Sequence, residues 1–552
     1  MFEGLSMYEA FYEAYLDYPH GLALYYMGKK FSYSKLNKYI NHYADILVNT
    51  LHLKKGDTIL IAQPNIPYAL ILFYAANKLG IICNFVHPFT PFNQIKNIYE
   101  RTNSKYAFLF EQRVAKEVEK YRDFASFIFV TRIEDFLPLG KKFIYHTFLN
   151  RKIRKKLGRY LNKFDGFKYV YKLKGTGAIP ETLTHFDKET CILLHSGSTT
   201  GAPKTICLSS SAFNFLAAHA CEFVDTTPEK IKGTGMLSVL PSFHGFGLCM
   251  TMHAPIVNRF ACVLMPKFSP KGVSKLIKKT YISVICGVPS MYEALLKCDE
   301  FVSNPKLKKL MVCFCGGDSM SISLKQRFDE VMKNNASTCQ IFEGYGLTEA
   351  IAVNSVNTYS HHRDGSIGYP ASGVDFKILG ENNEFLKPGE IGEIVIKTPS
   401  RMNGYFLDEE ATQATFYNDY LKTGDLGYMD EDGYIYFAQR KKRVVKVSGV
   451  GVFPTEIEKL VQTVPGVKEV CAIQIPDEKL IHAIKLFVVA TYFDKEGMKE
   501  NIIDTCRKYL IRWAVPKEIE FVDELPLTLL GKVDFNKLQI EENERRGIKN
   551  NA

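Results

Sequence analysis

The segment from Ser196 to Lys204 combines hydroxyl groups, glycines and one lysine in a way that suits phosphate binding. It reads Ser-Gly-Ser-Thr-Thr-Gly-Ala-Pro-Lys and follows the apolar run from Cys191 to Leu194. Glycines let backbone amides approach phosphate oxygens, hydroxyls add donors, and the lysine adds a positive charge. The glycines stand too close together for the P-loop pattern, and such a run alone is more often an ordinary turn. It predicts a polyphosphate site only if other segments supply the remaining groups.

Two further segments offer side chains for the other parts of a nucleotide. The run from Phe342 to Glu349 places an aromatic ring at Tyr345, a hydroxyl at Thr348 and a carboxylate at its end. These groups suit stacking on a base, contact with a phosphate and ligation of a cation. Asp425 lies in Lys-Thr-Gly-Asp, where its two oxygens could accept the hydroxyls of a ribose. Each segment is also common as a plain turn.

Three weaker patterns complete the set. His244 stands among aromatic residues and glycines, where a histidine more often serves packing than catalysis. Gly316 and Gly317 follow an apolar stretch, and paired glycines let a flat ligand approach the backbone. Asp430 and Asp432 precede a glycine, but the other ligands of a calcium loop are missing, so this segment predicts a hairpin turn.

The stretches around these residues alternate between strand-like and helix-like patterns over the first four-fifths of the chain. One example is the strand at 58–62, followed by an apolar helix-like run after Pro67. This alternation is typical of an α/β fold. A charged connector from Gln439 to Arg443 then predicts a domain boundary.

Beyond the connector the sequence predicts a compact domain of about 110 residues that mixes helices and strands. Residues 455–458 have the form of a capping box and predict the start of a helix with Ile457 and Val461 on its apolar face. Strands are expected at 470–475 and 483–491.

The composition narrows the class of protein. At 552 residues the chain is too long for one core, and its 46% apolar residues provide for a large interior. The best apolar run, at 68–86, is interrupted by Asn77 and Lys78 and falls short of the ~20 residues that span a bilayer. The first residues lack the pattern of a secretory signal, and the thirteen cysteines include no C-x-x-C pair. We therefore expect a soluble cytoplasmic protein with reduced cysteines.

The net charge of +11 is concentrated in one segment. Between Lys141 and Lys174 there are twelve lysines and arginines against one acid, Asp165, so the rest of the chain is formally neutral. This segment predicts a short cationic amphipathic helix with an apolar face made of Ile153, Leu157, Tyr160, Leu161 and Phe164. Such a helix suits peripheral contact with an anionic membrane or an acidic partner, and a solvated basic insertion fits equally well. A basic patch without a recognition motif does not predict nucleic-acid binding.

Taken together and in this order, the segments resemble the motifs of the adenylate-forming acyl-CoA synthetase family. The matching segments are 196–204, 241–247, 316–317, 344–349, 423–425, 440–446, 449–456 and 531–532. The resemblance spans nearly the whole chain. It implies a large N-terminal domain of β-sheets flanked by helices, with a β-barrel-like subdomain, and a small mobile α+β C-terminal domain. The implied domains are 1–439 and 440–552, with a hinge near Lys442.

The resemblance also implies the site residues. The expected nucleotide-binding residues are Ser196, Ser198, Thr199, Thr200, Lys204, Gly316, Gly317, Tyr345, Asp425, Arg440 and Gly449. The expected catalytic residues are Lys532, Glu349, Thr348 and His244, and the expected ligands of Mg²⁺ are Glu349 and Thr200. The implied cofactors are ATP, Mg²⁺ and coenzyme A. An acid would attack the α-phosphorus of ATP, and a thiol would attack the acyl-AMP after the small domain has rotated.

Four positions depart from the family pattern. Ser198 stands where the loop usually has glycine, Thr205 where a glycine often follows the loop lysine, and Gln439 where a glycine is common before Arg440. Arg443 replaces an acid beside the hinge residue, which bears on the energetics of rotation. A positive φ at Ser198 would cost about 1 kcal/mol.

The residues near His244 indicate an apolar acid. Amino-acid-activating relatives place an aspartate there, whereas this chain has Phe243 and Phe246. Aliphatic residues after Glu349 suit a medium- or long-chain fatty acyl tail or an aryl group. Three functions remain open: a fatty acyl-CoA synthetase, an acyl- or aryl-AMP ligase that loads an acyl carrier protein, and a catalytically idle relative that binds nucleotide or membrane. The carboxylates and the lysine of the expected site argue against the last.

Overall fold

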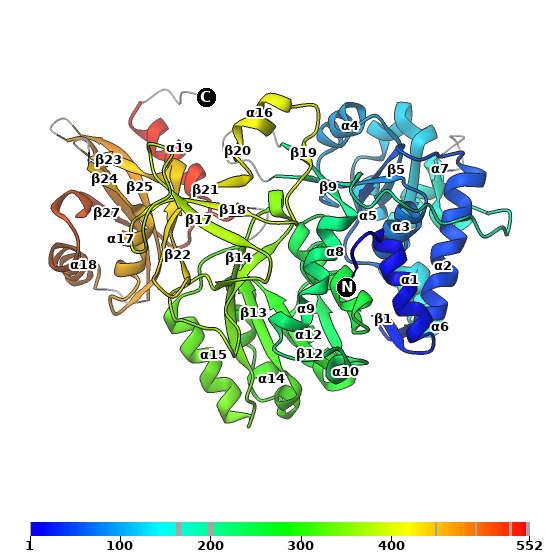
Figure 1. Cartoon of the computed structure of the whole chain (residues 1–552), viewed down its shortest axis with the longest axis horizontal. Coiled ribbons are helices and arrows are strands. Elements are labelled where there is room, and N and C mark those ends of the chain that lie inside the picture. Colours follow the sequence, from blue (N-terminus) through cyan, green and yellow to red (C-terminus); the bar gives the residue numbers. More distant parts are fainter. Residues whose placement is uncertain are drawn as a thin grey trace.

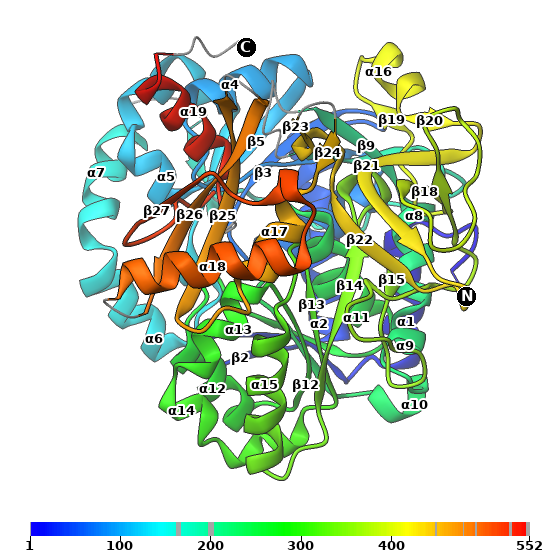
Figure 2. The ribbon, with the colours of Figure 1, turned by 90° about the vertical axis from the view of Figure 1, so that its left-hand side faces the viewer.

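Figure 1 shows the computed structural model of the chain, which divides into a large and a small domain. The structure describes residues 2–161, 167–196, 204–447, 450–477, 480–491, 494–528 and 533–547. The chain up to strand β22 (Ile435–Arg440) forms the large domain, and the chain from β23 (Val445–Val447) onward forms the small one. Figure 2 shows the small domain in front, with helix α18 (Lys495–Tyr509) running across it.

The first sheet of the large domain has nine strands in the order β16-β15-β14-β13-β12-β10-β11-β1-β2. The six from β14 to β1 run parallel, and the flanking pairs are antiparallel. They are β1 (Leu22–Tyr26), β2 (Lys29–Ser32), β10 (Gly235–Ser238), β11 (Ala261–Leu264), β12 (Ile282–Gly287), β13 (Val312–Gly316), β14 (Gln340–Gly346), β15 (Val353–Val356) and β16 (Tyr369–Pro370). Because ligands of parallel sheets bind beyond the carboxyl ends of the strands, the ends of β13 and β14 mark a place for the site.

The second sheet has eight strands in the order β19-β9-β8-β4-β3-β5-β6-β7. Its strands are β3 (Thr58–Ala62), β4 (Ile82–Phe85), β5 (Ser104–Phe110), β6 (Ile128–Thr131), β7 (Lys168–Tyr169), β8 (Thr190–His195), β9 (Thr205–Ser209) and β19 (Gly404–Tyr405). The six from β8 to β7 run parallel, whereas β8, β9 and β19 pair antiparallel. The glycine- and hydroxyl-rich loop therefore connects two neighbouring strands of this sheet.

Both sheets are buried on their two faces, which accounts for their nearly continuous apolar strands. In β3, Ile59 and Ile61 face the central hydrophobic core, and Leu60 faces the outer one. Helix α3 (Pro67–Lys78) lies in the central core with every residue buried, as expected for a helix that is apolar on all sides. The apolar run at 68–86 is thus interior. Among the described residues, no helix is long and apolar enough to cross a membrane.

Helices fill three layers around the two sheets. The central core contains α1 (Met7–Asp17), α2 (Tyr33–Asp45), α8 (Ser210–Ala218) and the π-helix η6 (Phe246–His253). The outer face of the nine-stranded sheet is covered by α12 (Pro270–Lys279), α13 (Pro289–Leu296) and α15 (Ile322–Asn334). The outer face of the eight-stranded sheet is covered by α4 (Phe92–Arg101), α5 (Glu111–Lys116) and α7 (Arg151–Leu161).

A third sheet occupies the place of the expected barrel-like subdomain. It consists of β17 (Asp375–Leu379), β18 (Gly392–Lys397), β20 (Phe416–Tyr417), β21 (Tyr420–Met429) and β22. All its pairs are antiparallel, and within the described residues they form an open path without ring closure. The predicted hairpin turn at Asp430 and Asp432 is confirmed: it joins β21 to β22, with Gly433 at a φ of 87°.

The small domain has its own two hydrophobic cores. It contains β24 (Val450–Val452), α17 (Pro454–Val461), β25 (Val467–Asp477), β26 (Ile481–Ala490), β27 (Glu518–Phe521) and α19 (Phe535–Arg545). Ile457 and Val461 are buried as predicted. The capping-box prediction is wrong, because α17 starts with Pro454 after Phe453, which makes no side-chain cap. Proline at the first helical position is pre-set for the helix and needs no donor there.

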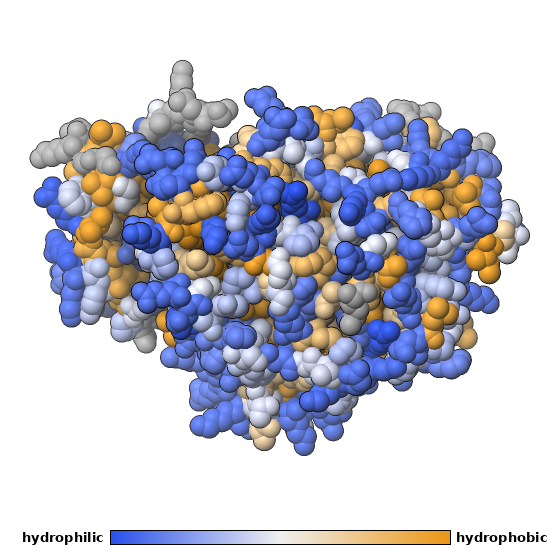
Figure 3. Space-filling view, in the orientation of Figure 1, coloured by the Kyte–Doolittle hydropathy of each residue, from blue (hydrophilic) through white to orange (hydrophobic). Residues whose placement is uncertain are grey.

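The cysteines are unpaired, as the sequence predicts. All thirteen are free, eleven are buried, and only Cys207 and Cys221 are partly exposed. Burial raises the pKa of both of these thiols to about 11. The face of the molecule in Figure 3 is mostly hydrophilic, with hydrophobic residues in separate patches.

Candidate active site

The two ends of the phosphate-type loop are held together at the edge of the eight-stranded sheet. The Ser196 amide donates to the Lys204 carbonyl at 2.9 Å, and the Lys204 amide donates to the Ser196 hydroxyl at 3.1 Å. Next to them His195 pairs with Thr205 across β8 and β9. The middle of the loop, with Ser198, Thr199 and Thr200, lies outside the described residues.

A partly buried polar network lies directly under the base of this loop. The Thr205 hydroxyl accepts from the guanidinium of Arg101 and hydrogen bonds to His195 Nδ1 at 3.1 Å. His195 Nε2 lies 2.7 Å from Asn84 Oδ1. Burial, and then the nearby charge of Arg101, lower the pKa of His195 to about 4. The ring is therefore neutral at pH 7, and the threonine that replaces a glycine has a use for its hydroxyl.

Lys204 and Glu349 meet through a residue that the sequence did not single out. Tyr405 in β19 donates its hydroxyl to Glu349 Oε1 at 3.0 Å, and the Lys204 ammonium lies 4.2 Å from the centre of the same ring. The Met402 amide donates to the Glu349 carbonyl at 2.7 Å, which fixes the short helix η8 (Thr348–Ala350) against this segment. A lysine over an aromatic face is held by the negative charge of the ring. The contact brings together a predicted phosphate-binding cation and a predicted metal-binding carboxylate.

A second cluster joins Tyr345, Asp425 and Arg440 from three strands. Tyr345 donates its hydroxyl to Asp425 Oδ2 at 2.6 Å, and Arg440 Nε lies 3.0 Å from Oδ1. Asp425 and Arg440 are partners in the β21–β22 register. The Asp425 side chain is 3% exposed and that of Arg440 58%, so the carboxylate is buried and its cation reaches solvent. Burial, and then the charge of Asp425, raise the pKa of Tyr345 well above its usual range.

A pocket opens between η6 and the carboxyl ends of β13 and β14, with about 780 Å³ of empty space including its mouth. It brings His244 together with Gly316, Gly317 and Tyr345, four of the predicted site residues. A side chain at Gly316 would approach the Phe246 ring to 3.3 Å, so the glycine permits this close packing. The rest of the lining is largely apolar, and the described residues that line the pocket include no carboxylate.

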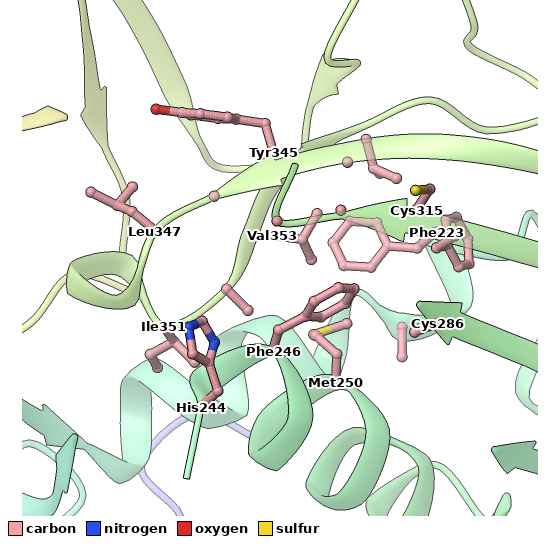
Figure 4. A pocket seen from close by; sticks show the side chains of 18 of the residues that line it. Phe223, His244, Phe246, Met250, Cys286, Cys315, Tyr345, Leu347, Ile351 and Val353 are labelled. Atoms are coloured by element: carbon pink, nitrogen blue, oxygen red, sulfur yellow. The ribbon is translucent and has the colours of Figure 1, made fainter. Parts of the chain in front are cut away.

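Figure 4 shows how these side chains lie. Phe246 points into the pocket between Met250 and Val353, and the His244 ring lies beside Ile351. The hydroxyl of Tyr345 points away from them, toward its contact with Asp425. The pocket is therefore apolar in its depth and polar only where Tyr345 and His244 stand.

The backbone is strained where η8 meets this pocket. Ile351 has a φ of 65° and a ψ of −61°, and the Ala352 amide donates to the Ala350 carbonyl at 2.8 Å. This is a γ-turn of the rare, strained type, which is unusual for a β-branched residue. A Cβ at Gly245 would lie 1.8 Å from the Ile351 carbonyl oxygen, and a Cβ at Gly346 1.4 Å from that of Ala352. Both glycines are thus required by the path of the turn.

The connector between the domains is held on both sides of Lys442. Lys441 Nζ lies 2.8 Å from Glu393 Oε2 of the large domain. Arg443 makes a two-pronged ion pair with Glu458 of the small domain, with one contact at 3.0 Å. Strand β22 extends to Arg440, so this residue is part of the large domain's sheet. The side chains before and after Lys442 are therefore anchored in different domains.

Gln439 is the last of the four departures from the family pattern. Gln439 is fully buried, and its amide atoms have no hydrogen-bond partner in the described part of the chain. The predicted site residues Gly449 and Lys532 lie outside the described residues. Thr348 opens η8 next to Glu349, which keeps the two side by side.

The predicted amphipathic helix is confirmed, although Phe164 and the Leu161 side chain of its predicted apolar face lie outside the described part of the chain. Helix α7 forms, but Leu157 is fully buried, and Ile153 and Tyr160 pack against the outer core of the eight-stranded sheet. With these residues the helix covers the outer face of the sheet, because an amphipathic helix is stabilised when its apolar side chains pack on a core.

Comparisons with known proteins agree with this architecture. Residues 11–406 match the family model of the AMP-binding enzymes, and residues 456–532 match that of the AMP-binding enzyme C-terminal domain. The long-chain-fatty-acid–CoA ligase of Bacillus subtilis (strain 168) is 29% identical over 547 residues, covering 96% of this chain and 94% of that protein.

Two solved structures share the fold. ATP-bound MatB from Rhodopseudomonas palustris superposes with a TM-score of 0.82 at 21% identity, covering 98% of this chain and all of that one. The anthranilate CoA ligase AuaEII in complex with anthranoyl-AMP gives a TM-score of 0.80 at 21% identity, covering 99% and 98%. Because the family models match most of the large domain and the body of the small one, the chain belongs to the AMP-binding enzymes of the adenylate-forming acyl-CoA synthetase family.

Proposed function

We propose that this chain activates a medium- or long-chain fatty acid to its acyl-AMP and transfers the acyl group to coenzyme A. Family membership makes it an AMP-forming acid–thiol ligase, and enzymes of this kind use ATP, Mg²⁺ and coenzyme A. The observation that carries the choice of acid is the pocket under Tyr345, whose depth is lined by Phe246, Met250 and Val353. Without a carboxylate among its described lining residues, it offers no partner for a substrate ammonium.

We assign each part of the nucleotide to a different group of residues in the site. Lys204, with Ser196, Ser198, Thr199 and Thr200 of its loop, would hold the phosphates. Tyr345, with the backbone at Gly316 and Gly317, would lie against the adenine, and Thr348 would contact the α-phosphate. Asp425 would accept the ribose hydroxyls, supported by Arg440 at 3.0 Å. His244 would stand where the acid meets the nucleotide, because it lines the polar end of the pocket.

The residues present suit a single magnesium ion that arrives with ATP. Mg²⁺ keeps several waters and is typically bound by one or two carboxylates together with substrate phosphates. Glu349 supplies one carboxylate, and the described residues contain no cluster of three metal-ligating side chains. Glu349 and Thr200 would hold the ion, which would offset the charge of the phosphates when bound.

We further propose two domains close to the predicted bounds of 1–439 and 440–552, with Arg440 counted in the sheet of the large domain, and rotation about Lys442. The hydrophobic cores support this, because those of the large domain contain described residues only up to Ile435 and those of the small domain begin at Val445. Lys532 and Gly449 belong to the small domain and would reach the site in turn. Lys532 would lie at the site during adenylation, and the segment at Gly449 would lie there during the thiol step. Lys532→Ala should reduce adenylation strongly and spare thioester formation from supplied acyl-AMP, and equal loss in both steps would contradict the rotation.

Pyrophosphate release with acids of increasing chain length, with and without coenzyme A, tests the main proposal. We expect acid-dependent release with a preference for longer chains, followed by thioester formation with coenzyme A. Met250→Phe should shift the preference to shorter acids and leave the KM for ATP unchanged, because Met250 lies in the acid pocket. Thioester formed only with an acyl carrier protein would favour the carrier-loading function, and no acid-dependent release would leave the idle relative.

We also propose that the enzyme contacts an anionic membrane through the segment Lys141 to Lys174. The support is its charge, since twelve basic residues there face one acid. A substrate with a long alkyl chain is itself concentrated in membranes, so such a contact would serve the proposed activity.

A further inference from the structure

Five large apolar side chains stand in solvent on the helical segment that precedes α7. They lie on α6 (Leu139–Ile144) and the π-helix η4 (Tyr145–Leu149). We call them the apolar row: Leu139 (88% exposed), Phe143 (65%), Ile144 (53%), Phe148 (70%) and Leu149 (69%). Five such residues within one short segment differ from the single exposed hydrophobics that are normal on a protein surface.

Two polar side chains, His146 in the segment and Asn150 directly after it, make contacts with the large domain. The His146 imidazole lies 2.8 Å from Glu134 Oε1, and the Asn150 amide donates to Glu111 Oε2 at 2.7 Å. Both carboxylates are buried, with Glu111 fully so. A helix on the surface of a globular protein normally turns its apolar side inward. Here the polar side chains fix the segment to the domain, and the apolar row is left pointing outward.

Cations continue the same surface along the chain. Helix α7 follows directly after Asn150, and its apolar side packs on the protein, so its basic side chains are turned to solvent. The exposed ones are Arg151, Lys152, Lys155, Lys156 and Arg159. Figure 1 shows α6 and α7 on the side of the large domain remote from the small domain, so rotation of the small domain leaves them accessible.

We infer that the apolar row and the exposed cations of α7 together form a docking surface for an anionic lipid bilayer, with the row inserted at the level of the headgroups and the cations at the phosphates. Apolar side chains beside lysines and arginines are what binding to such an interface requires. This inference goes beyond acid activation and deepens the membrane contact proposed above, because it assigns the contact to residues 139–149 together with the cations of α7.

A second copy of this chain and an acidic protein are the two alternative partners for this surface, and its composition argues against both. A second copy of this chain would bring two strongly basic segments together, which like-charge repulsion opposes. An acidic protein would satisfy the cations but would have no use for five large apolar side chains at 53–88% exposure. A bilayer satisfies both parts of the surface.

Flotation with lipid vesicles tests the inference on the full-length chain. Vesicles of phosphatidylcholine alone are compared with vesicles of equal parts phosphatidylcholine and phosphatidylglycerol. We expect binding to the anionic vesicles that weakens with added salt. Phe143→Ser combined with Phe148→Ser should reduce that binding about tenfold or more, because two large apolar groups no longer enter the interface.

The chain offers a matched control. Ile179 and Leu407 are 74% and 84% exposed and lie outside the segment, so Ile179→Ser combined with Leu407→Ser removes as much exposed apolar surface and should leave vesicle binding unchanged. Lys152→Gln, Lys155→Gln and Lys156→Gln together should weaken binding and flatten its salt dependence. Thermal melting verifies that each variant is folded.

Activity on a short, water-soluble acid, measured without vesicles, keeps this inference separate from the proposed function. We expect the apolar-row variant to match the unmodified chain in that assay and differ only in flotation. Equal flotation of the apolar-row and control variants would overturn the inference, as would a chain that fails to float with anionic vesicles while activating acids. A dimer in sedimentation that the apolar-row variant abolishes would assign the surface to a second copy instead.

Discussion

Replacing Ile351 tests whether the γ-turn at the pocket stores strain. Ile351→Ala and Ile351→Gly both remove the same buried side chain, which is 1% exposed, so the cost of the lost packing cancels in their difference. Alanine keeps a residue with a Cβ at a φ of 65°, and such backbone costs about 1–3 kcal/mol. Glycine adopts it freely but loses about 0.5–1 kcal/mol of unfolded-chain entropy. Glycine should therefore be the more stable variant by about 1 kcal/mol.

The control is Ile277 in α12, which is also 1% exposed but lies in a helix. There glycine should be less stable than alanine by about 1 kcal/mol. Urea unfolding followed by far-ultraviolet circular dichroism measures both pairs, since the single tryptophan, Trp513, lies in the small domain and reports on that domain alone. Glycine and alanine in the same order at both positions would refute the strain at Ile351.

Three further predictions concern contacts described above. Tyr405→Phe removes the donor to Glu349 and should raise the KM for Mg·ATP several-fold while leaving the fold intact; an unchanged KM would separate this contact from nucleotide binding. Burial raises the pKa of Glu111 from 4.5 to about 7. The folded state therefore favours the neutral form, and about 3 kcal/mol of stability that is present below pH 4.5 is lost as the pH rises through 7. Glu111→Gln should melt at a higher temperature than the unmodified chain at pH 8 and at the same temperature at pH 4.5; an equal difference at both pH values would contradict this. Arg443→Ala removes the ion-pair partner of Glu458, whose side chain is 16% exposed and keeps the Ala472 amide as a donor. The change should destabilise the small domain by about 3–5 kcal/mol, seen as an earlier unfolding transition in tryptophan fluorescence; an unchanged transition would show that the pair adds nothing.

Local patterns in the sequence predicted the elements and their class. The strand β3, the apolar helix α3, the hairpin at Asp430 and the charged connector at Gln439 all follow from neighbouring residues. The motifs also located the residues of the pocket, because their order along the chain resembles that of a known family. The elements depend on contacts within one segment, and the site residues were found through the motif order of a known family.

The sequence did not predict which distant segments contact each other. Tyr405 reaches Glu349 across 56 residues and Tyr345 reaches Asp425 across 80, and nothing in the spacing singles out which aromatic ring pairs with which carboxylate. The strain at Ile351 was hidden for another reason, since an isoleucine is a poor sign of a positive φ. Helical spacing identified the apolar face of α7 but not the core of the large domain that covers it.

The low reactivity of the native thiols makes the proposed rotation observable by chemical labelling. A thiol with a pKa of about 11, as at Cys207 and Cys221, is ionised in only about one molecule in ten thousand at pH 7, whereas an exposed cysteine of ordinary pKa is ionised in a few per cent. Cysteines introduced at Ile322 on the large domain and Tyr509 on the small one, which are 71% and 64% exposed, would therefore react with maleimide dyes about a hundred times faster than the most accessible native thiols. The distance between two fluorophores can then be followed through the reaction cycle without first removing thirteen native cysteines.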